Sequence, residues 1–103
     1  MKPAHLIAAL ALAALTGSAA AQAPDPHLAR NLAATCANCH GTNGRAVPGS
    51  GMEALAGTDK AKLVEKFREY RSGIRPATVM HQIAKGYSDE QIELIAAYFA
   101  AQK

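Results

Sequence analysis

Two cysteines and a histidine within five consecutive residues form the strongest chemical signal in the sequence. Cys36-Ala37-Asn38-Cys39-His40 places two thiols one helical turn apart, with an imidazole directly after the second. This spacing is typical of c-type haem attachment, because thiols so placed can reach both vinyl groups of one haem. His40 would then lie beneath the iron as its proximal ligand. The motif therefore predicts one covalently bound haem c.

Three other interpretations of the motif remain open. A redox-active cysteine pair usually begins a helix in a βαβ setting, and the sequence shows no such strands. A zinc site needs four ligands. Cys36, Cys39, His40 and His81 could supply them, but the sequence then lacks a second pair of closely spaced ligands. A structural disulfide would not require His40. Covalent haem is the interpretation that uses every residue of the motif.

A sixth ligand for the iron has several candidates: Met52, Met80, His27 and His81. Methionine opposite histidine suits electron transfer, because it raises the reduction potential. Met52 follows His40 closely, whereas Met80 lies far enough along the chain to return on the other face of a haem. We therefore expect Met80 to be the distal ligand, with filling of the core as its alternative role. His81 would point about 100° round a helix from Met80, so both cannot face the iron.

Four helical segments are expected to position these residues, and no segment shows strand alternation, so the predicted fold class is all-α. Asp25 and Thr58 are candidate caps for the first two helices, and Gly73 is the expected end of the second. Ser88 and Gln91 predict a capping box at the start of the fourth. The expected helices cover residues 26–36, 59–72, 77–85 and the segment from 88 onward.

The buried faces of these helices follow from apolar spacing. The first helix presents Leu28, Leu32 and Cys36 on one face. The second and fourth are expected to bury Leu63, Val64, Phe67 and Tyr70, and Ile92, Ile95, Ala96 and Phe99. Residues 41–57 contain five glycines and few large apolar groups. So long a loop in so small a domain indicates that it wraps around something.

The first 21 residues are typical of a cleaved secretory signal. Lys2 and His5 precede a ten-residue run of Ala, Leu and Ile, which is shorter than the roughly 20 residues needed to cross a bilayer. Small residues follow, and cleavage fits after Ala21 or Ala23. The sequence thus predicts a signal peptide at 1–21, a monohaem domain at 22–103, a periplasmic location and no stable membrane insertion.

Charge and composition limit the classes of function that the chain can have. Beyond the signal, ten Lys and Arg are interspersed with eight Asp and Glu, which does not favour nucleic-acid binding. Without a Gly-X-Gly-X-X-Gly motif, a flavin would have to lie on another chain. Arg45 is the only charged residue from Cys36 to Met52, so this stretch could form an apolar docking face. Lys60, Lys62, Lys66 and Arg68 could form a docking surface, but the interleaved Glu65 and Glu69 favour a solvated helix face.

Five pieces of the chain together resemble a class I cytochrome c of the small bacterial type. They are Cys36–Gly41, Leu55-Ala56-Gly57, Phe67-Arg68 with Arg71-Ser72-Gly73, the segment around Met80 and the closing Ala96-Ala97-Tyr98-Phe99. The resemblance covers residues 27–102. It implies about four helices wrapped round one haem, with Cys36 and Cys39 as attachment sites, His40 proximal and Met80 distal. Many relatives carry a proline just before Leu-Ala-Gly whose carbonyl contacts the proximal histidine, and here Pro48 is the candidate for that contact.

The stretch from Arg71 to Ser88 is similar to the cytochrome subunit of flavocytochrome c sulfide dehydrogenase and to Sox-pathway cytochromes. This resemblance implies one-electron transfer from an FAD-containing subunit that oxidises sulfide, or from another redox protein. The chain itself could then be an electron carrier or part of an enzyme complex. A freely diffusing carrier to a terminal oxidase or reductase is the alternative. Two hypotheses of other classes are a haem sensor or enzyme with an open sixth position and a zinc-structured binding module.

Overall fold

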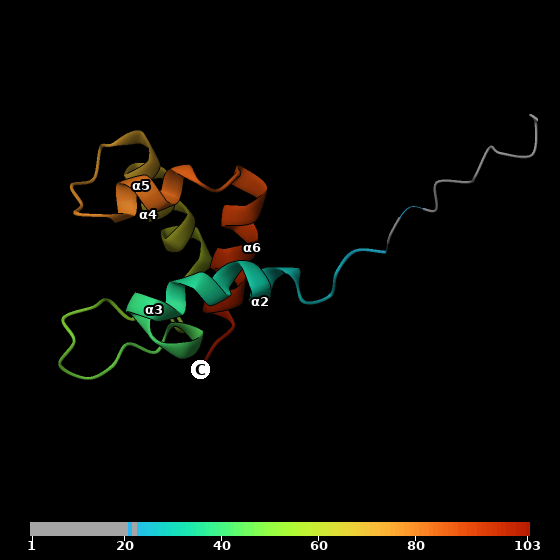
Figure 1. Ribbon diagram of the computed structural model, residues 1–103, viewed down its shortest axis with the longest axis horizontal. Helices are drawn as coiled ribbons and strands as arrows, with labels where there is room; N and C mark the ends of the chain where they lie inside the picture. Colours follow the sequence, from blue (N-terminus) through green and yellow to red (C-terminus); the bar gives the residue numbers. More distant parts are fainter. Residues whose placement is uncertain (1–20, 22) are drawn as a thin grey trace, which may run out of the picture.

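The computed structural model describes residue 21 and residues 23–103, which fold as helices joined by loops (Figure 1). No strand occurs in this described part of the chain, in agreement with the all-α prediction. The predicted signal peptide lies outside the described residues except for residue 21. None of the helices described is long and apolar enough to span a bilayer. The elements are α2 (Leu28–Ala33), the 3₁₀ turn η2 (Ala34–Cys36), α3 (Ala37–His40), the 3₁₀ turn η3 (Thr42–Gly44), α4 (Lys60–Ser72), α5 (Met80–Lys85) and α6 (Asp89–Ala100).

The last helix, α6, begins with the capping box that the sequence predicts. The Ser88 hydroxyl accepts a hydrogen bond from the Gln91 amide at 3.2 Å, and the Gln91 side chain accepts one from the Ser88 amide at 3.0 Å. Both bonds satisfy backbone donors that the first turn of a helix would otherwise leave free. The helix buries Ile92, Ile95, Ala96 and Phe99, as expected.

The longest helix, α4, also lies where the sequence predicts it, but its cap is different. Asp59, not Thr58, is the N-cap, and its carboxylate accepts a hydrogen bond from the Lys62 amide at 3.1 Å. Gly73 ends the helix in the left-handed conformation, with φ of +84°. Leu63, Val64 and Phe67 are buried on one side of the helix.

The first predicted helix begins later than expected and is divided into α2 and η2, and α3 continues beyond its predicted end. Asp25 does accept a hydrogen bond from the His27 amide at 2.8 Å, but this bond closes a turn, and regular α geometry begins only at Leu28. A 3₁₀ turn then separates α2 from α3. Leu28 is 44% exposed, whereas Leu32 and Cys36 are partly buried against the core, so the predicted face is correct only in its second half.

The third predicted helix is shorter than expected at its start. Residues 77–79 form no helix, and α5 begins at Met80 after Val79, which has φ of −138° and makes no side-chain cap. Pro76 therefore precedes a non-helical approach to α5 rather than its first turn.

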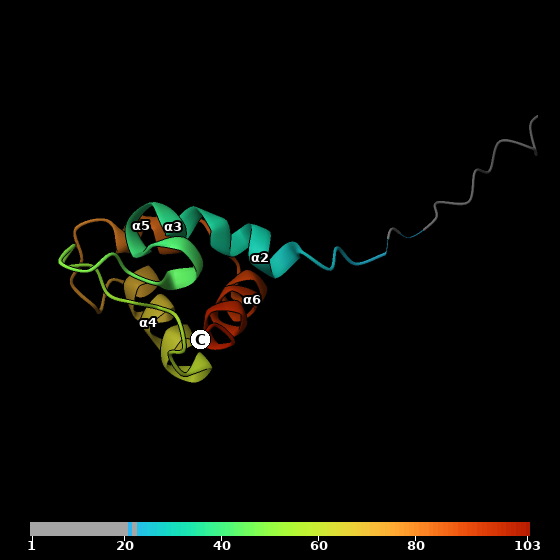
Figure 2. The same ribbon diagram turned by 90° about the horizontal axis from the view of Figure 1, so that it is seen from below.

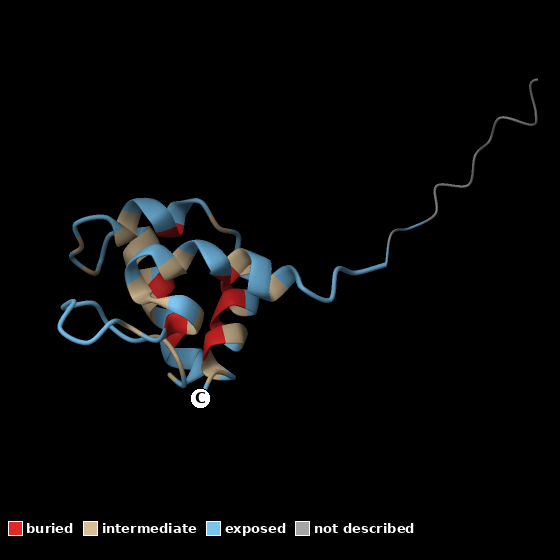
Figure 3. Ribbon diagram, turned by 60° about the horizontal axis from the view of Figure 1, so that its bottom comes forward, coloured by how far each residue is buried: buried red, intermediate tan, exposed pale blue. Residues whose placement is uncertain are grey.

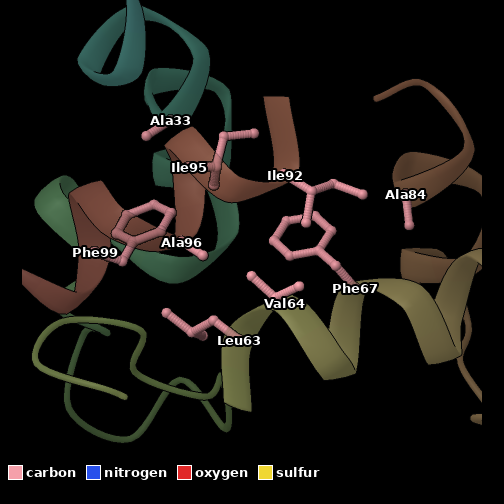
Figure 4. Packing of buried hydrophobic residues seen from close by; sticks show 9 residues of the cluster. All are labelled: Ala33, Leu63, Val64, Phe67, Ala84, Ile92, Ile95, Ala96 and Phe99. Atoms are coloured by element: carbon pink, nitrogen blue, oxygen red, sulfur yellow. The ribbon is translucent and has the colours of Figure 1, made fainter. Parts of the chain in front are cut away.

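The core lies between four helices, α2, α4, α5 and α6. α6 packs against both α2 and α4, and α5 packs on α4 (Figure 2). Buried positions lie on the helix faces turned toward one another, while much of the connecting loops is exposed (Figure 3). Figure 4 shows the buried side chains converging between the helices. These are Ala33, Leu63, Val64, Phe67, Ala84, Ile92, Ile95, Ala96 and Phe99.

Candidate functional site

The four residues predicted to bind haem lie around one cavity of about 740 Å³. Cys36, Cys39 and His40 come from η2 and α3, and Met80 comes from the first turn of α5. The 41–57 loop contributes to the wall, as its length and composition suggest. Apolar and aromatic side chains form much of the remaining lining, among them Leu55, Leu63, Phe67, Tyr70, Val79, Ile83 and Tyr87.

Local backbone geometry presents the motif to this cavity. Cys36 is the N-cap of α3, so the two cysteines lie on consecutive turns of the chain. The helix ends at Gly41, whose amide donates to the Ala37 carbonyl at 3.1 Å. Gly41 has φ of +80° and turns the chain away immediately after His40. The three chemically active side chains of the motif therefore share a short, well-defined segment.

A hydrogen bond fixes the orientation of the His40 ring. Its Nδ1 lies 2.6 Å from the backbone carbonyl oxygen of Glu53. Because a carbonyl can only accept, Nδ1 is the donor in this contact, and Nε2 is the ring nitrogen left to offer a lone pair. That lone pair is what a metal ligand requires.

The acceptor of this hydrogen bond corrects one sequence-based expectation. Pro48 was the candidate, but the carbonyl belongs to Glu53, which lies directly before the Ala54-Leu55-Ala56-Gly57 segment. Pro48 is exposed and does not line the cavity. Glu53 lies two residues before Leu55-Ala56-Gly57 and supplies this carbonyl without being a proline.

The cysteine environment does not support a redox dithiol. Both thiols are free. Burial raises the pKa of the Cys36 thiol above its ordinary value, whereas reactive cysteine pairs depend on a lowered pKa. In the described chain no three His, Cys, Asp or Glu side chains are grouped to hold a metal ion, so the zinc hypothesis lacks its ligand set there.

The candidate distal ligands differ in position. Met80 lines the cavity, is partly buried and packs against the core. Met52 also lines the cavity but is 40% exposed. His27 is the exposed N-cap of α2, and neither it nor His81 lines the cavity. The structure thus brings two methionines to the site and neither of these histidines.

Contacts that the sequence did not predict join different segments of the cavity wall. The Thr35 and Tyr87 hydroxyls are 2.9 Å apart and join the haem motif to the segment before α6. The Phe67 ring meets the Tyr87 ring edge-on, with centroids 6.4 Å apart. Arg71 donates to the Tyr87 carbonyl at 3.3 Å. Tyr87 therefore lines the cavity, whereas Tyr98 does not line it and donates to Asn43 at 2.5 Å.

The residues present fit a c-type haem. The cavity volume lies within the range of about 300–1,000 Å³ usual for cofactor sites, and its lining is largely apolar. Two free thiols are available for covalent attachment, a histidine engaged through Nδ1 has Nε2 left for a metal, and a partly buried methionine supplies a thioether. This donor set matches the requirements of haem and not those of a hard cation.

Comparisons with known proteins agree with this assignment. The sequence model of the family described as cytochrome c matches residues 28–103. The chain is 37% identical over 89 residues to the cytochrome subunit of sulfide dehydrogenase from Chlorobaculum tepidum, covering 84% of this chain and 79% of that protein. It is 35% identical over 96 residues to the thiosulfate dehydrogenase electron acceptor of Stutzerimonas stutzeri, covering 87% of this chain and 44% of that protein.

Solved structures show the same fold. The crystal structure of reduced recombinant cytochrome c4 from Pseudomonas stutzeri superposes with a TM-score of 0.65 at 24% identity, covering 77% of this chain and 50% of that chain. The chain thus spans most of one relative but about half of this structure and less than half of the thiosulfate dehydrogenase acceptor.

Proposed function

The chain belongs to the cytochrome c family, and from this premise we propose that it passes single electrons between redox proteins with His40 and Met80 as its iron ligands. It is a class I c-type cytochrome that carries one covalent haem c and transfers electrons by it. The haem supplies an iron that gains or loses one electron. The observation that carries the ligand proposal is the meeting of Cys36, Cys39, His40 and Met80 at one cavity.

Each of these residues has a distinct task. Cys36 and Cys39 would form the two thioether links, which hold the cofactor in a domain too small to enclose it fully. His40 offers Nε2 to the iron, and the Glu53 carbonyl keeps its ring orientation fixed. Met80 lies in the first turn of α5 and packs against the core, so its thioether is held by a helix and not by a loop.

The distal ligand is tested by comparing two methionine variants. Met80→Ala is expected to abolish the far-red methionine–iron band of the oxidised protein and to lower its midpoint potential. Met52→Ala is the matched control, because Met52 also lines the cavity, and both properties should be nearly unchanged. The opposite pattern would assign the ligand to the 41–57 loop. Absence of this band from the oxidised parent would favour an open sixth position.

For the partner, we propose an FAD-containing protein that oxidises sulfide and binds the cytochrome stably. Support comes from the relative named as a subunit of sulfide dehydrogenase. Apolar side chains are also exposed: Val79, which lines the cavity, is 50% exposed, and Val47 of the 41–57 loop is 65% exposed. Arg45 is the only charged residue from Cys36 to Met52. Its side chain donates to the Lys103 carbonyl at 2.9 Å, so this charge is engaged within the chain.

Gel filtration at low and high salt separates this partner from the alternative. A complex held by apolar burial should survive high salt, because salt screens exposed charge pairs and not apolar contacts. Dissociation at high salt, or the absence of any complex with the candidate flavoprotein, would support a freely diffusing carrier to an oxidase or reductase. The relative named as a thiosulfate dehydrogenase electron acceptor makes that alternative worth testing.

The proposed location is the periplasm, with a mature domain of residues 22–103. The sequence of the first 21 residues supports this proposal. N-terminal sequencing of the exported protein should begin at Gln22, or at Pro24 if the later site is cleaved. A protein that keeps Met1 in a membrane fraction would contradict it.

A further inference from the structure

Glu53 makes two contacts of different kinds at the edge of the cavity. Its backbone carbonyl accepts the hydrogen bond from His40 Nδ1 at 2.6 Å. Its carboxylate forms an ion pair with the Lys66 ammonium of α4. Glu53, Lys66 and His40 all line the cavity. One residue therefore connects the proximal histidine to a long helix.

The segment that carries the Glu53 carbonyl has no regular secondary structure of its own. After it, the Leu55 and Ala56 amides both donate to the Gly44 carbonyl, at 2.8 and 3.1 Å. Before it, the Met52 amide donates to the Ser50 hydroxyl within the same exposed loop, at 3.3 Å. Hydrogen bonds to another backbone segment thus hold the chain after the Glu53 carbonyl but not the chain before it.

The ion pair with Lys66 gives Glu53 a second contact, and Lys66 lies on a rigid helix, α4. Its neighbour Phe67 and the nearby Leu63 are buried in the core, so α4 cannot shift easily. The Lys66 and Glu53 side chains are 31% and 52% exposed. A pair so exposed contributes little to overall stability. What it restricts is the position of one loop residue relative to one helix.

We propose that the Glu53–Lys66 ion pair positions the Glu53 carbonyl and so strengthens its hydrogen bond to His40. A stronger bond makes Nε2 a better donor, which favours the oxidised iron and lowers the midpoint potential. Glu53 and Lys66 are therefore positioning residues that act through His40. The inference rests on the proposed role of His40 as iron ligand.

Two single variants of the intact haem protein separate positioning from simple electrostatics. Glu53→Gln removes a negative charge and Lys66→Met removes a positive one. If the pair acts by position, both variants loosen the carbonyl, and the midpoint potential rises in both. If the charges act only through their fields, the potential rises in Glu53→Gln but falls in Lys66→Met. Opposite signs, or no shift in either variant, would overturn the proposal.

Two further variants serve as controls. Lys66→Arg keeps the cation and should retain the parent potential, and a rise as large as that of Lys66→Met would count against positioning. Lys60→Met removes another exposed ion pair of α4, the one with Glu93 at 2.9 Å, and neither of its residues lines the cavity. Its potential should equal the parent's, and a rise would show that breaking any α4 ion pair has the same effect.

A second measurement reports on the hydrogen bond itself. In the reduced protein, the His40 Nδ1 proton should exchange with solvent faster in Glu53→Gln and Lys66→Met than in the parent. His40 ring signals displaced by the haem in the parent establish ligation independently. Their absence there would overturn the proposed function. Their presence with unchanged proton exchange in both variants would overturn only the positioning role.

Discussion

At the scale of single residues, Gly41 limits what the haem motif tolerates. It has φ of +80° and ψ of 162°, a conformation that other residues avoid at a cost of about 1–3 kcal/mol. A Cβ at this position would also lie 1.8 Å from the Arg45 carbonyl oxygen, so two backbone segments would have to separate. Gly41→Ala is expected to lower the free energy of unfolding by this strain plus about 1–3 kcal/mol of overpacking, measured by denaturant titration.

Gly49 provides the control for this prediction. It also has a positive φ, of +77°, but a Cβ there would meet no atom within 4 Å. Gly49→Ala should therefore carry only the backbone strain. Equal losses of stability in the two variants would show that the contact with Arg45 is unimportant.

Residue types also decide which parts of the site the sequence can predict. Cys36, Cys39 and His40 are recognisable because their side chains carry the chemistry at a fixed spacing. The acceptor on His40 is a backbone carbonyl, which every residue has, so nothing in the side chain of Glu53 indicates it. Only the fold shows which carbonyl lies within reach.

At the scale of the helices, an ion pair links the start of α6 to α4. Arg71 donates to the Asp89 carboxylate at 2.5 Å. This hydrogen bond, with the positive charge of Arg71, lowers the pKa of Asp89 below its ordinary value of 3.8. A carboxyl with a lowered pKa stabilises the folded state above its unfolded pKa, and the effect is lost as the pH falls through the folded one.

Asp89→Asn is therefore expected to be less stable than the parent at neutral pH. The difference should shrink as the pH falls below 3.8, because the parent carboxyl then becomes protonated. Urea titrations at neutral and acid pH measure it. Glu90→Gln is the control: Glu90 shares the first turn of α6 but makes no ion pair within the described chain. A pH-independent difference would show that Asp89 acts only as a polar helix-start residue.

Helix boundaries, like the site residues, can be predicted from the sequence where local signals set them and not where contacts elsewhere in the fold do. α4 and α6 could be predicted closely, because a cap, an apolar stripe and, for α4, a terminal glycine all occur in sequence order. α2 and α5 begin later than their local signals indicate. Neither has a side-chain cap, so contacts elsewhere in the fold set their first turns.

At the scale of the whole molecule, the buried core is small. Among the residues that the structure describes, the largest fully buried side chains are Ile92, Ile95 and Phe99. The largely apolar cavity borders the same core through Leu63 and Phe67. A domain of this size usually needs a cofactor or crosslink to fold stably. The haem therefore completes the interior of the protein as well as carrying its function.

Replacing both cysteines tests this structural role. In the parent, colour should remain with the protein after extraction with acidified acetone, because the haem is covalent. In the double variant Cys36→Ala/Cys39→Ala, colour should leave with the solvent, and thermal unfolding should become broad and less cooperative. Retention of colour by the double variant would mean that the attachment sites lie elsewhere.

The packing of α2 against α6 also bears on the order in which the chain folds. These are the first and last helices described, so their contact must close a loop that contains most of the domain. Contacts so distant in sequence form slowly, whereas α4, α5 and α6 follow one another and can associate early. We expect Ala33→Gly in α2 to accelerate unfolding far more than it slows folding. Since the motif follows α2 directly, its thiols would remain accessible until this late step, which leaves a period during folding in which a haem can be attached.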